Sequence, residues 1–217
     1  MANPQWFDRD AHLAWGFYGH RLNLYRATVP HNGFEILLNW GREKPGGYFV
    51  FTSNVDGQFQ QAGFDDHRIN ECHGSIHHLQ CSTPCGEAIW NFEGIEVDVN
   101  EKTMNAGEPL PECPNCGKAA RPNILMFGDW GWLARRTQDQ QYLYHDWLEQ
   151  NKNRSIVVVE CGAGTGIPTV RMTSESIVSR YNASLIRINA REPRVPPGQI
   201  GLAMGALDAL TKIKNSI

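Results

Sequence analysis

Four cysteines form two closely spaced pairs in the middle of the chain. Cys81 and Cys85 enclose three residues, Cys113 and Cys116 enclose two, and about 27 residues separate the pairs. A short C-x(2–4)-C pair turns two thiolates toward one point, and two such pairs complete a tetrahedral zinc site. Four protein ligands leave no open coordination position, so the spacing predicts a structural zinc. Free or disulfide-bonded cysteines are the alternative.

The other cysteines and the nearby histidines carry a weaker chemical signal. Cys72 and Cys161 stand beside apolar, strand-like stretches, which favours small core residues over nucleophiles. His73, in "ECHGS", could act as a general base near neutral pH, but a structural histidine fits the same pattern. His77 and His78 are predicted to be ordinary surface or packing residues.

Composition places the chain among globular proteins and argues against several partners. Its 217 residues are 41% hydrophobic and 20% charged, with a formal net charge of -3. Because no basic patch stands out, neither nucleic acid nor an anionic membrane is expected as a partner. No apolar run reaches the roughly 20 residues that span a bilayer, and the N-terminus does not resemble a secretory signal. We therefore expect a cytoplasmic protein with reduced cysteines; the oligomeric state is left open.

Helical and strand-like patterns alternate along most of the chain. This alternation, with nearly continuous apolar strands, predicts an α/β fold in which helices cover both faces of a doubly wound, Rossmann-like parallel sheet. Polar loops ("TSNVDG", "GAGTG" and "NARE") follow three of the strands, at the edge where such sheets bind ligands. Helices are expected over 9–27, 28–43, 58–63, 137–150, 168–180 and 205–217, and strands at 48–52, 154–161 and 184–189.

One stretch departs from this regular pattern. Residues 72–122 have little periodicity and many Gly, Pro, Asn and Glu residues. This composition suggests an inserted zinc-ribbon module that is held together by something other than a hydrophobic core. We predict one domain over 1–217, with this module inserted at 72–122 and residues 1–45 forming the helical part of the smaller subdomain.

Five segments, in order, resemble the sirtuins, the NAD-dependent protein-lysine deacylases. They are "FTSNVDGQFQQAG", "INECHGSIHHLQCSTPC", "CPNCGKAARPNILMFGD", "VVECGAGTGIP" and "RINARE". The resemblance implies NAD as co-substrate, one structural zinc and acylated-lysine proteins as partners. It implies a reaction in which the acyl group ends on ADP-ribose and nicotinamide leaves.

The resemblance also assigns roles to residues, each of which has a plainer structural alternative. His73 would be the base for a ribose hydroxyl of NAD. A turn with a helix cap is the alternative for 54–57, and core packing is the alternative for Phe127. The remaining implied roles are the nicotinamide–ribose pocket (Asn54, Asp56), the ribose and phosphates (Gly162, Ala163, Thr165), the adenine ribose (Asn189) and the acyl-lysine tunnel (Phe127, Gly128).

Tyr18 and Arg21 resemble the Y-x-x-R pair of the desuccinylase-type sirtuins. Residues three apart share one helix face, and a guanidinium with a phenol could bind the carboxylate of a succinyl or malonyl group. An interfacial tyrosine beside a solvated arginine is the alternative.

Some family features are absent from the sequence. The opening strand and the G-A-G-x-S loop of sirtuins have no counterpart, so the resemblance implies a sheet that lacks the usual first strand and most phosphate contacts. Ser53 stands where the family usually has Gln, and Ala163 where it has Ser. A non-catalytic, zinc-stapled fragment is therefore one alternative function. An NAD glycohydrolase or ADP-ribosyltransferase that uses the same pocket is another.

Overall fold

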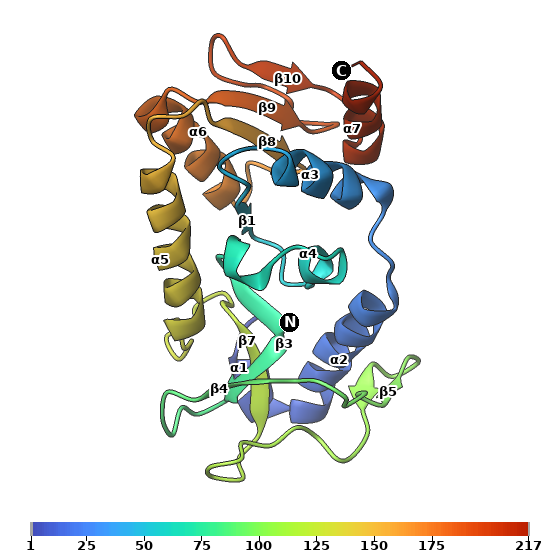
Figure 1. The fold of residues 1–217 in the computed structure, drawn as a ribbon. Coiled ribbons are helices and arrows are strands. Elements are labelled where there is room, and N and C mark those ends of the chain that lie inside the picture. The colour runs from blue at the N-terminus through green and yellow to red at the C-terminus, as the bar shows by residue number, and fades with distance from the viewer. Residues whose placement is uncertain (1, 217) are drawn as a thin grey trace. The chain divides into compact units, whose positions relative to one another are not determined.

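The computed structural model describes residues 2–216, which form two compact units (Figure 1). Each unit combines stretches that are far apart in the sequence. Unit 1 comprises the residues up to Val29, Asn54–Gln61 and Glu71–Gln141, and unit 2 comprises Pro30–Ser53, Ala62–Asn70 and the residues from Tyr142 onward.

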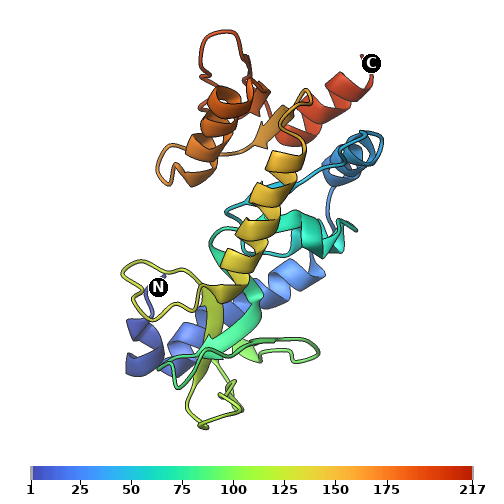
Figure 2. The same cartoon turned by 60° about the vertical axis from the view of Figure 1, so that its left-hand side comes forward.

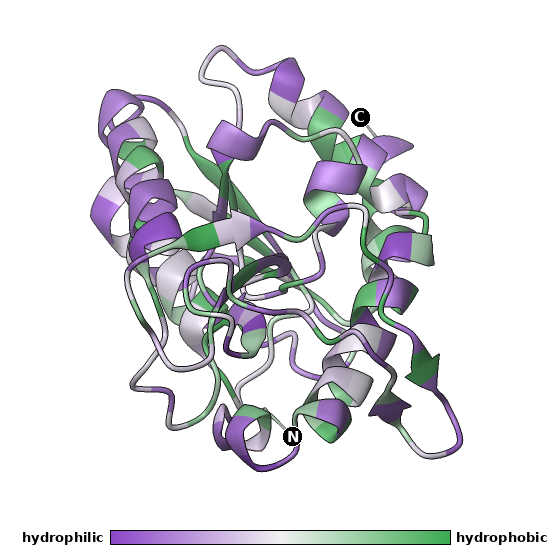
Figure 3. Ribbon diagram, turned by 90° about the horizontal axis from the view of Figure 1, so that it is seen from below, coloured by the Kyte–Doolittle hydropathy of each residue, from purple (hydrophilic) through white to green (hydrophobic). Residues whose placement is uncertain are grey.

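Helices occupy most of the stretches in which a helical pattern was predicted. They are α1 (Gln5–Arg9), α2 (Ala11–Ala27), α3 (Asn32–Arg42), α4 (Gln58–Gln61), the 3₁₀ helix η1 (Asp66–Arg68), α5 (Arg135–Gln150), α6 (Thr169–Tyr181) and α7 (Ala206–Lys214). Hydrophobic and hydrophilic residues alternate along the helices (Figure 3). Among the described helices, none combines the length and the apolar character that crossing a bilayer requires.

Side-chain caps explain where the first long helices begin. The prediction of one helix over 9–27 is wrong in its first turn, because Asp10 separates α1 from α2 and accepts a hydrogen bond from the Leu13 amide at 3.0 Å. Nδ1 of His31 accepts from the Gly33 amide at 3.0 Å and caps α3. The polar residue before each helix thus sets its start.

The strands form small sheets within the chain. They are β1 (Val50–Thr52), β2 (Ile69–Glu71), β3 (Gly74–Cys81), β4 (Ile89–Asn91), β5 (Val99–Asn100), β6 (Asn105–Ala106), β7 (Ala120–Ile124), β8 (Val157–Cys161), β9 (Ser184–Ile188) and β10 (Ile200–Leu202). Their orders are β4-β3-β7, β10-β9-β8, β1-β2 and β5-β6. The first of these sheets and the β5-β6 pair are antiparallel, whereas β10-β9-β8 is parallel.

Unit 1 has its core between α2 and the antiparallel sheet. Trp15 is fully buried, and its indole N–H donates to the carbonyl of Ala120 on β7 at 2.9 Å. Gly16 allows the neighbouring chain to approach α2, because a Cβ there would lie 1.8 Å from the carbonyl oxygen of Met104. Ile76 and Leu79 of β3 belong to the same buried cluster. The expectation that 72–122 is held by something other than a core is therefore wrong.

Unit 2 contains the parallel sheet that the sequence predicts. The helix α6 connects β8 to its neighbour β9 and packs against both strands (Figure 2). Ile188 at the end of β9 packs with Ile36 of α3 and with Leu210 of α7. Strands and helices alternate here as in the predicted α/β fold.

Candidate active site and metal centre

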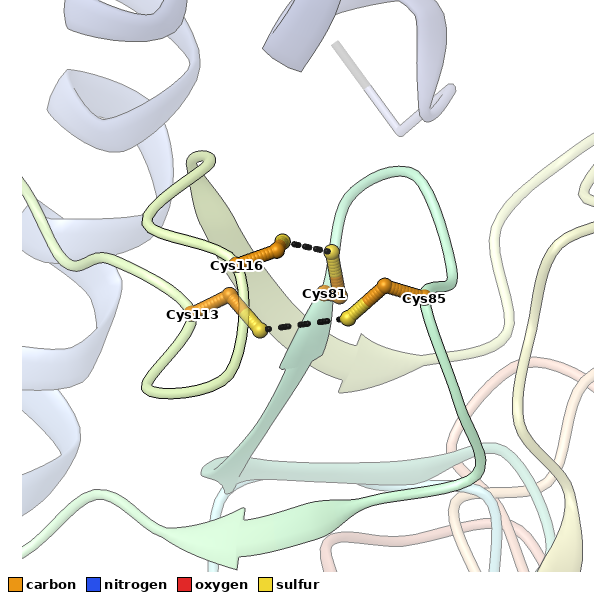
Figure 4. Close-up of side chains that lie close together, drawn as sticks. All are labelled: Cys81, Cys85, Cys113 and Cys116. Atoms are coloured by element: carbon orange, nitrogen blue, oxygen red, sulfur yellow. Dashed lines mark hydrogen bonds between the residues drawn. The ribbon is translucent and has the colours of Figure 1, made fainter.

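The four paired cysteines converge on one point in unit 1 (Figure 4). Cys81 is the last residue of β3, Cys85 lies on the loop that follows it, and Cys113 and Cys116 lie on the facing loop. Their sulfur atoms all lie within 4.8 Å of one another. The Sγ–Sγ distance is 3.7 Å from Cys81 to Cys116 and 3.6 Å from Cys85 to Cys113.

These distances fit a tetrahedral zinc ion. With Zn–S bonds of about 2.3 Å, the edges of the tetrahedron are about 3.8 Å. All four thiols are free, and the carboxamide of Asn115 donates to the sulfur of Cys85 at 3.2 Å. The prediction that both pairs form one metal site is confirmed, and its four-sulfur donor set suits a structural zinc.

His73 lies at the turn between β2 and β3, beside the end of β7. Its carbonyl accepts a hydrogen bond from the Leu125 amide at 2.9 Å, and its side chain is half-buried. Gly74, the next residue, has φ +80°, which side-chain-bearing residues rarely adopt. This turn thus holds His73 next to the loop that carries Phe127.

We expect Gly74→Ala to destabilise unit 1 strongly. The positive φ alone costs about 1–3 kcal/mol for other residues, and a Cβ would lie 2.0 Å from the carbonyl oxygen of Asn123. Urea denaturation of the variant would measure the loss. Gly63→Ala is the control, because Gly63 shares the positive φ but has nothing within 4 Å of its Cβ position. Equal losses in both variants would contradict a steric contribution from Asn123.

The loop of residues 54–57 is bonded to β3 just beyond His73. The Ile76 amide donates to the carbonyl of Val55 at 3.0 Å, and Nε2 of His77 lies 2.9 Å from the carbonyl oxygen of Asp56. Oδ1 of Asp56 accepts from the Gln58 amide at 3.0 Å, as in the turn-and-cap alternative. His77, predicted to be an ordinary residue, thus braces this loop, a role that no pattern in the sequence indicates.

Phe127 and Gly128 lie on the loop that follows β7. The side chain of Phe127 is 68% exposed, so core packing, its structural alternative, is wrong. Its amide donates to the carbonyl of Ala2 at 3.0 Å, and Gly128 has φ +67°. Nearby, the guanidinium of Arg121 forms two hydrogen bonds of 2.8 Å to the carboxylate of Asp129, and both side chains are buried.

Tyr18 and Arg21 lie on α2 but have different surroundings. Tyr18 is buried against Phe7 and Phe17, and burial raises its pKa to about 12 although the Arg121 and Arg21 guanidinium groups lower it. Arg21 is exposed, stacks over the ring of Phe17 and donates to the hydroxyl of Tyr25 at 3.2 Å.

The predicted cofactor residues of unit 2 lie on two adjoining loops after β8 and β9. The Gly162 amide donates to the carbonyl of Ile188 at 2.9 Å, and the carboxamide of Asn189 donates to the carbonyl of Ala163, also at 2.9 Å. Thr165 donates to the carboxylate of Glu192 through its amide at 3.0 Å and through its hydroxyl at 2.5 Å. The structure thus joins the "GAGTG" and "NARE" loops.

Sequence reasoning missed two residues that hold these loops together. Hydrogen bonds from Thr165 hold the pKa of Glu192 below its usual value. Arg171 on α6 donates to the carbonyl of Ala163 at 3.0 Å and also to the carbonyl of Glu192. Glu192 could have been found as an acidic residue after a strand of a predicted nucleotide-binding unit. Arg171 lies within a predicted helix, where an arginine gives no sign of a contact with these loops.

The two cysteines outside the metal site differ from each other. Burial raises the pKa of Cys72 to about 11, so its thiol is poorly suited to act as a nucleophile. Cys161 is exposed at the end of β8, and its prediction as a core residue is wrong. The strand β8 that carries Cys161 is only partly buried, since Val157 on the same strand is 58% exposed.

The fold and these sites define a class of protein. Unit 2 is a parallel α/β unit with a glycine-rich turn after one strand and an acidic residue after the next, as in nucleotide-binding proteins. Unit 1 carries a four-cysteine metal centre and a histidine-containing turn. The Sir2 family model matches residues 1–145, and the chain therefore belongs to the Sir2 family, the sirtuins.

Curated relatives of the chain are named NAD-dependent protein deacylases. The protein from Thermococcus kodakarensis is 33% identical over 133 residues, which cover 59% of this chain and 47% of the relative. The protein from Aquifex aeolicus is 31% identical over 129 residues, covering 59% and 48%. The chain thus spans about half the length of these relatives. A protein from Pyrococcus abyssi is 27% identical over 200 residues, covering 91% of this chain and 71% of the relative.

Solved structures share the fold at lower sequence identity. Sir2Tm bound to a propionylated peptide has a TM-score of 0.67 and 18% identity, covering 99% of this chain and 82% of that chain. Sir2 bound to an acetylated peptide has a TM-score of 0.67 and 19% identity, with the same coverage. The predicted α/β class with a cysteine-bound metal module is confirmed.

Proposed function

We propose that this protein removes acyl groups from protein lysines in an NAD-dependent reaction that yields nicotinamide and O-acyl-ADP-ribose. One observation carries the proposal. In unit 1, main-chain hydrogen bonds join the His73 turn both to the 54–57 loop, through β3, and to the loop that presents Phe127. A base, an amide–carboxylate loop and an aromatic substrate loop are thereby grouped, and the names of the curated relatives support the same reaction.

The residues of unit 1 have roles that suit this chemistry. Bound NAD would supply the ribose that accepts the acyl group. The imidazole of His73 takes a proton from a ribose hydroxyl and so acts as the general base. Asn54 and Asp56 orient the nicotinamide carboxamide, because an amide bonds both ways and a carboxylate accepts.

The loops of unit 2 hold the adenosine part of the cofactor in this proposal. Gly162 and Ala163 leave the backbone accessible in the glycine-rich turn. Because the donors of Thr165 are already bonded to Glu192, this turn suits ribose hydroxyls better than phosphate. Asn189 and Glu192 together offer the amide and carboxylate groups that hydroxyls bind.

The substrate side combines exposed residues of the loop after β7 and of α2 with the buried Tyr18. Phe127 and Gly128 border the acyl-lysine tunnel, and the adjoining backbone pairs an extended acylated peptide as an added strand. The exposed guanidinium of Arg21 on α2, with Tyr18 on the same helix, binds an acyl group that ends in a carboxylate, such as succinyl or malonyl. Four free thiols at a zinc site suit a reducing compartment, so we place the activity in the cytoplasm.

Nicotinamide release by the purified chain tests the proposal. The chain is incubated with NAD, with or without an acetyl- or succinyl-lysine peptide. We expect peptide-dependent release that falls by about 10²–10⁴-fold in His73→Ala, because that variant loses the general base. His67→Ala, which changes an exposed histidine, should retain full activity.

The other outcomes separate the alternatives. Release without any peptide would indicate an NAD glycohydrolase or ADP-ribosyltransferase instead. A folded, zinc-loaded chain that releases no nicotinamide under any of these conditions would contradict the proposal and favour a non-catalytic module. A faster reaction with acetyl-lysine than with succinyl-lysine peptide would contradict the role of Arg21.

A further inference from the structure

We infer that Gln80 is a positioning residue that couples the four-cysteine metal centre to the loop of residues 125–133. Gln80 immediately precedes the metal ligand Cys81 on β3, and its side chain reaches the loop that follows β7. The role of this coupling in peptide binding rests on the proposed function. The coupling itself is a property of unit 1 and can be measured without any reaction.

The carboxamide of Gln80 holds the loop through both of its ends. It is completely buried. Its Nε2 donates to the carbonyl of Gly131 at 2.8 Å, and its Oε1 accepts from the Leu133 amide at 3.1 Å. Asn123 supports this arrangement, since its Nδ2 donates to Oε1 of Gln80 and to the carbonyl of Leu133, both at 2.9 Å.

A second buried contact holds the same loop from the neighbouring strand. Gln80 is paired with Arg121 in the register of β3 and β7. The guanidinium of Arg121 binds the carboxylate of Asp129, and Oδ1 of Asp129 accepts from the Gly131 amide at 3.2 Å. Gly131 is therefore bonded directly to Gln80 of β3 and, through Asp129, to Arg121 of β7, so its backbone position depends on how the ends of β3 and β7 are held.

The metal centre sits at those strand ends. Cys81 is paired with Ala120 in the next position of the same register. Pro84, between the two ligands of the first pair, lies 3.7 Å from the position of a Cβ on Gly131. A zinc ion that fixes Cys81 and Cys85 thereby also fixes Gln80 and the surface on which the loop rests.

The loop exposes two large aromatic side chains on this fixed backbone. Phe127 is 68% exposed and Trp130 is 99% exposed. Such side chains on a preorganised loop bind a partner at a small cost in conformational entropy. In the proposed reaction, Gln80 would therefore raise the affinity for the acylated peptide and have little effect on the rate of the chemical step.

Hydrogen–deuterium exchange of Gln80→Met tests the coupling, with Gln138→Met as the matched control because Gln138 is exposed on α5. Each protein is loaded with zinc, and bound zinc is measured. Because the variant leaves buried polar groups of the loop unpaired, we expect exchange of residues 125–133 to rise about tenfold or more, with zinc retained. In the wild type, chelation should raise exchange in the same segment.

Gln80→Glu separates coupling from misfolding. This variant keeps the acceptor for Leu133 and Asn123 but turns a carboxylate oxygen toward the carbonyl of Gly131, so the rise in exchange is expected to centre on Gly131. Unchanged exchange of 125–133 in both variants would overturn the coupling, as would full protection of the loop after the metal has been removed.

Kinetics then test the consequence for the reaction. If peptide-dependent nicotinamide release is observed, Gln80→Met should raise KM for the acylated peptide about tenfold and leave kcat within about twofold. A loss of kcat with an unchanged KM would overturn the substrate-side role. If no release is observed from the wild type, the proposed function fails, whereas the exchange result still decides the coupling.

Discussion

Removing zinc is expected to unfold the part of unit 1 that contains the cysteines. Structural zinc contributes about 10–16 kcal/mol of apparent binding energy in small zinc domains, whereas a whole domain has a stability of about 5–15 kcal/mol. Here the ligands lie at the end of β3 and on the facing loop of the same unit. Loss of the ion would remove the four metal–sulfur bonds that join the two halves of the site.

Thermal unfolding followed by circular dichroism, with and without a zinc chelator, measures this effect. Cys113→Ser should behave like the chelated wild type, because Cys113 is a buried member of the set. Cys161→Ser is the control, since Cys161 lies exposed and outside the set. One equivalent of zinc in the wild type and less in Cys113→Ser is also expected. An unchanged melting temperature after complete removal of zinc would contradict a stabilising role of the metal.

The parallel unit could be predicted from the sequence because its signals are local. The apolar run at 156–159 and the glycine-rich turn after it correspond to β8 and its C-terminal loop. Continuous apolar strands and helices of ordinary length carry their own periodicity. The short strand β10 has no such pattern, with exposed Ile200 and Gly201, and escaped prediction.

The antiparallel sheet of unit 1 could not be predicted for a different reason. The pairing of β3 with β7 shifts register between Ser75 and Leu79. Such a shift breaks the alternation of buried and exposed residues, which is the main strand signal. Gln80 is a polar residue next to the apolar Leu79, so strand alternation predicts that it is exposed. It is instead completely buried in a hydrogen-bond network.

The metal ligands and the resemblance motifs were identifiable because their spacing is fixed by chemistry. Two closely spaced cysteine pairs are typical of a zinc site, and the convergence of Cys81, Cys85, Cys113 and Cys116 was expected. The roles of His73 and of the predicted cofactor and substrate residues stay predictions, as do the module limits at 72–122. Supporting contacts such as His77 to Asp56 join residues distant in the sequence, so no local pattern could indicate them.

Arg187→Met is expected to destabilise unit 2 by about 3–5 kcal/mol. Arg187 on β9 and Glu160 on β8 are both almost completely buried, and Nη2 of Arg187 donates to the Glu160 carboxylate at 2.9 Å. Nη2 also donates to Glu175 of α6 at 3.0 Å, and Nη1 donates to the carbonyl of Arg194 at 2.7 Å. Removing the guanidinium leaves a buried carboxylate without its counter-ion, which is the costly way to break a buried ion pair.

Urea denaturation of zinc-loaded protein measures this loss and distinguishes its two physical causes. If the cost comes from the unpaired carboxylate, the double variant Arg187→Met with Glu160→Leu should recover most of the stability, because apolar side chains replace both charges. If the cost came only from lost packing, the double variant would be no more stable than the single one. Arg180→Met, at an exposed arginine on α6, should change stability by no more than about 0.5 kcal/mol.

The buried pair joins β8 to β9 close to the ends from which the loops with Ala163 and Asn189 begin. If the double variant recovered stability without recovering the proposed NAD binding, the charges would be shown to position those loops.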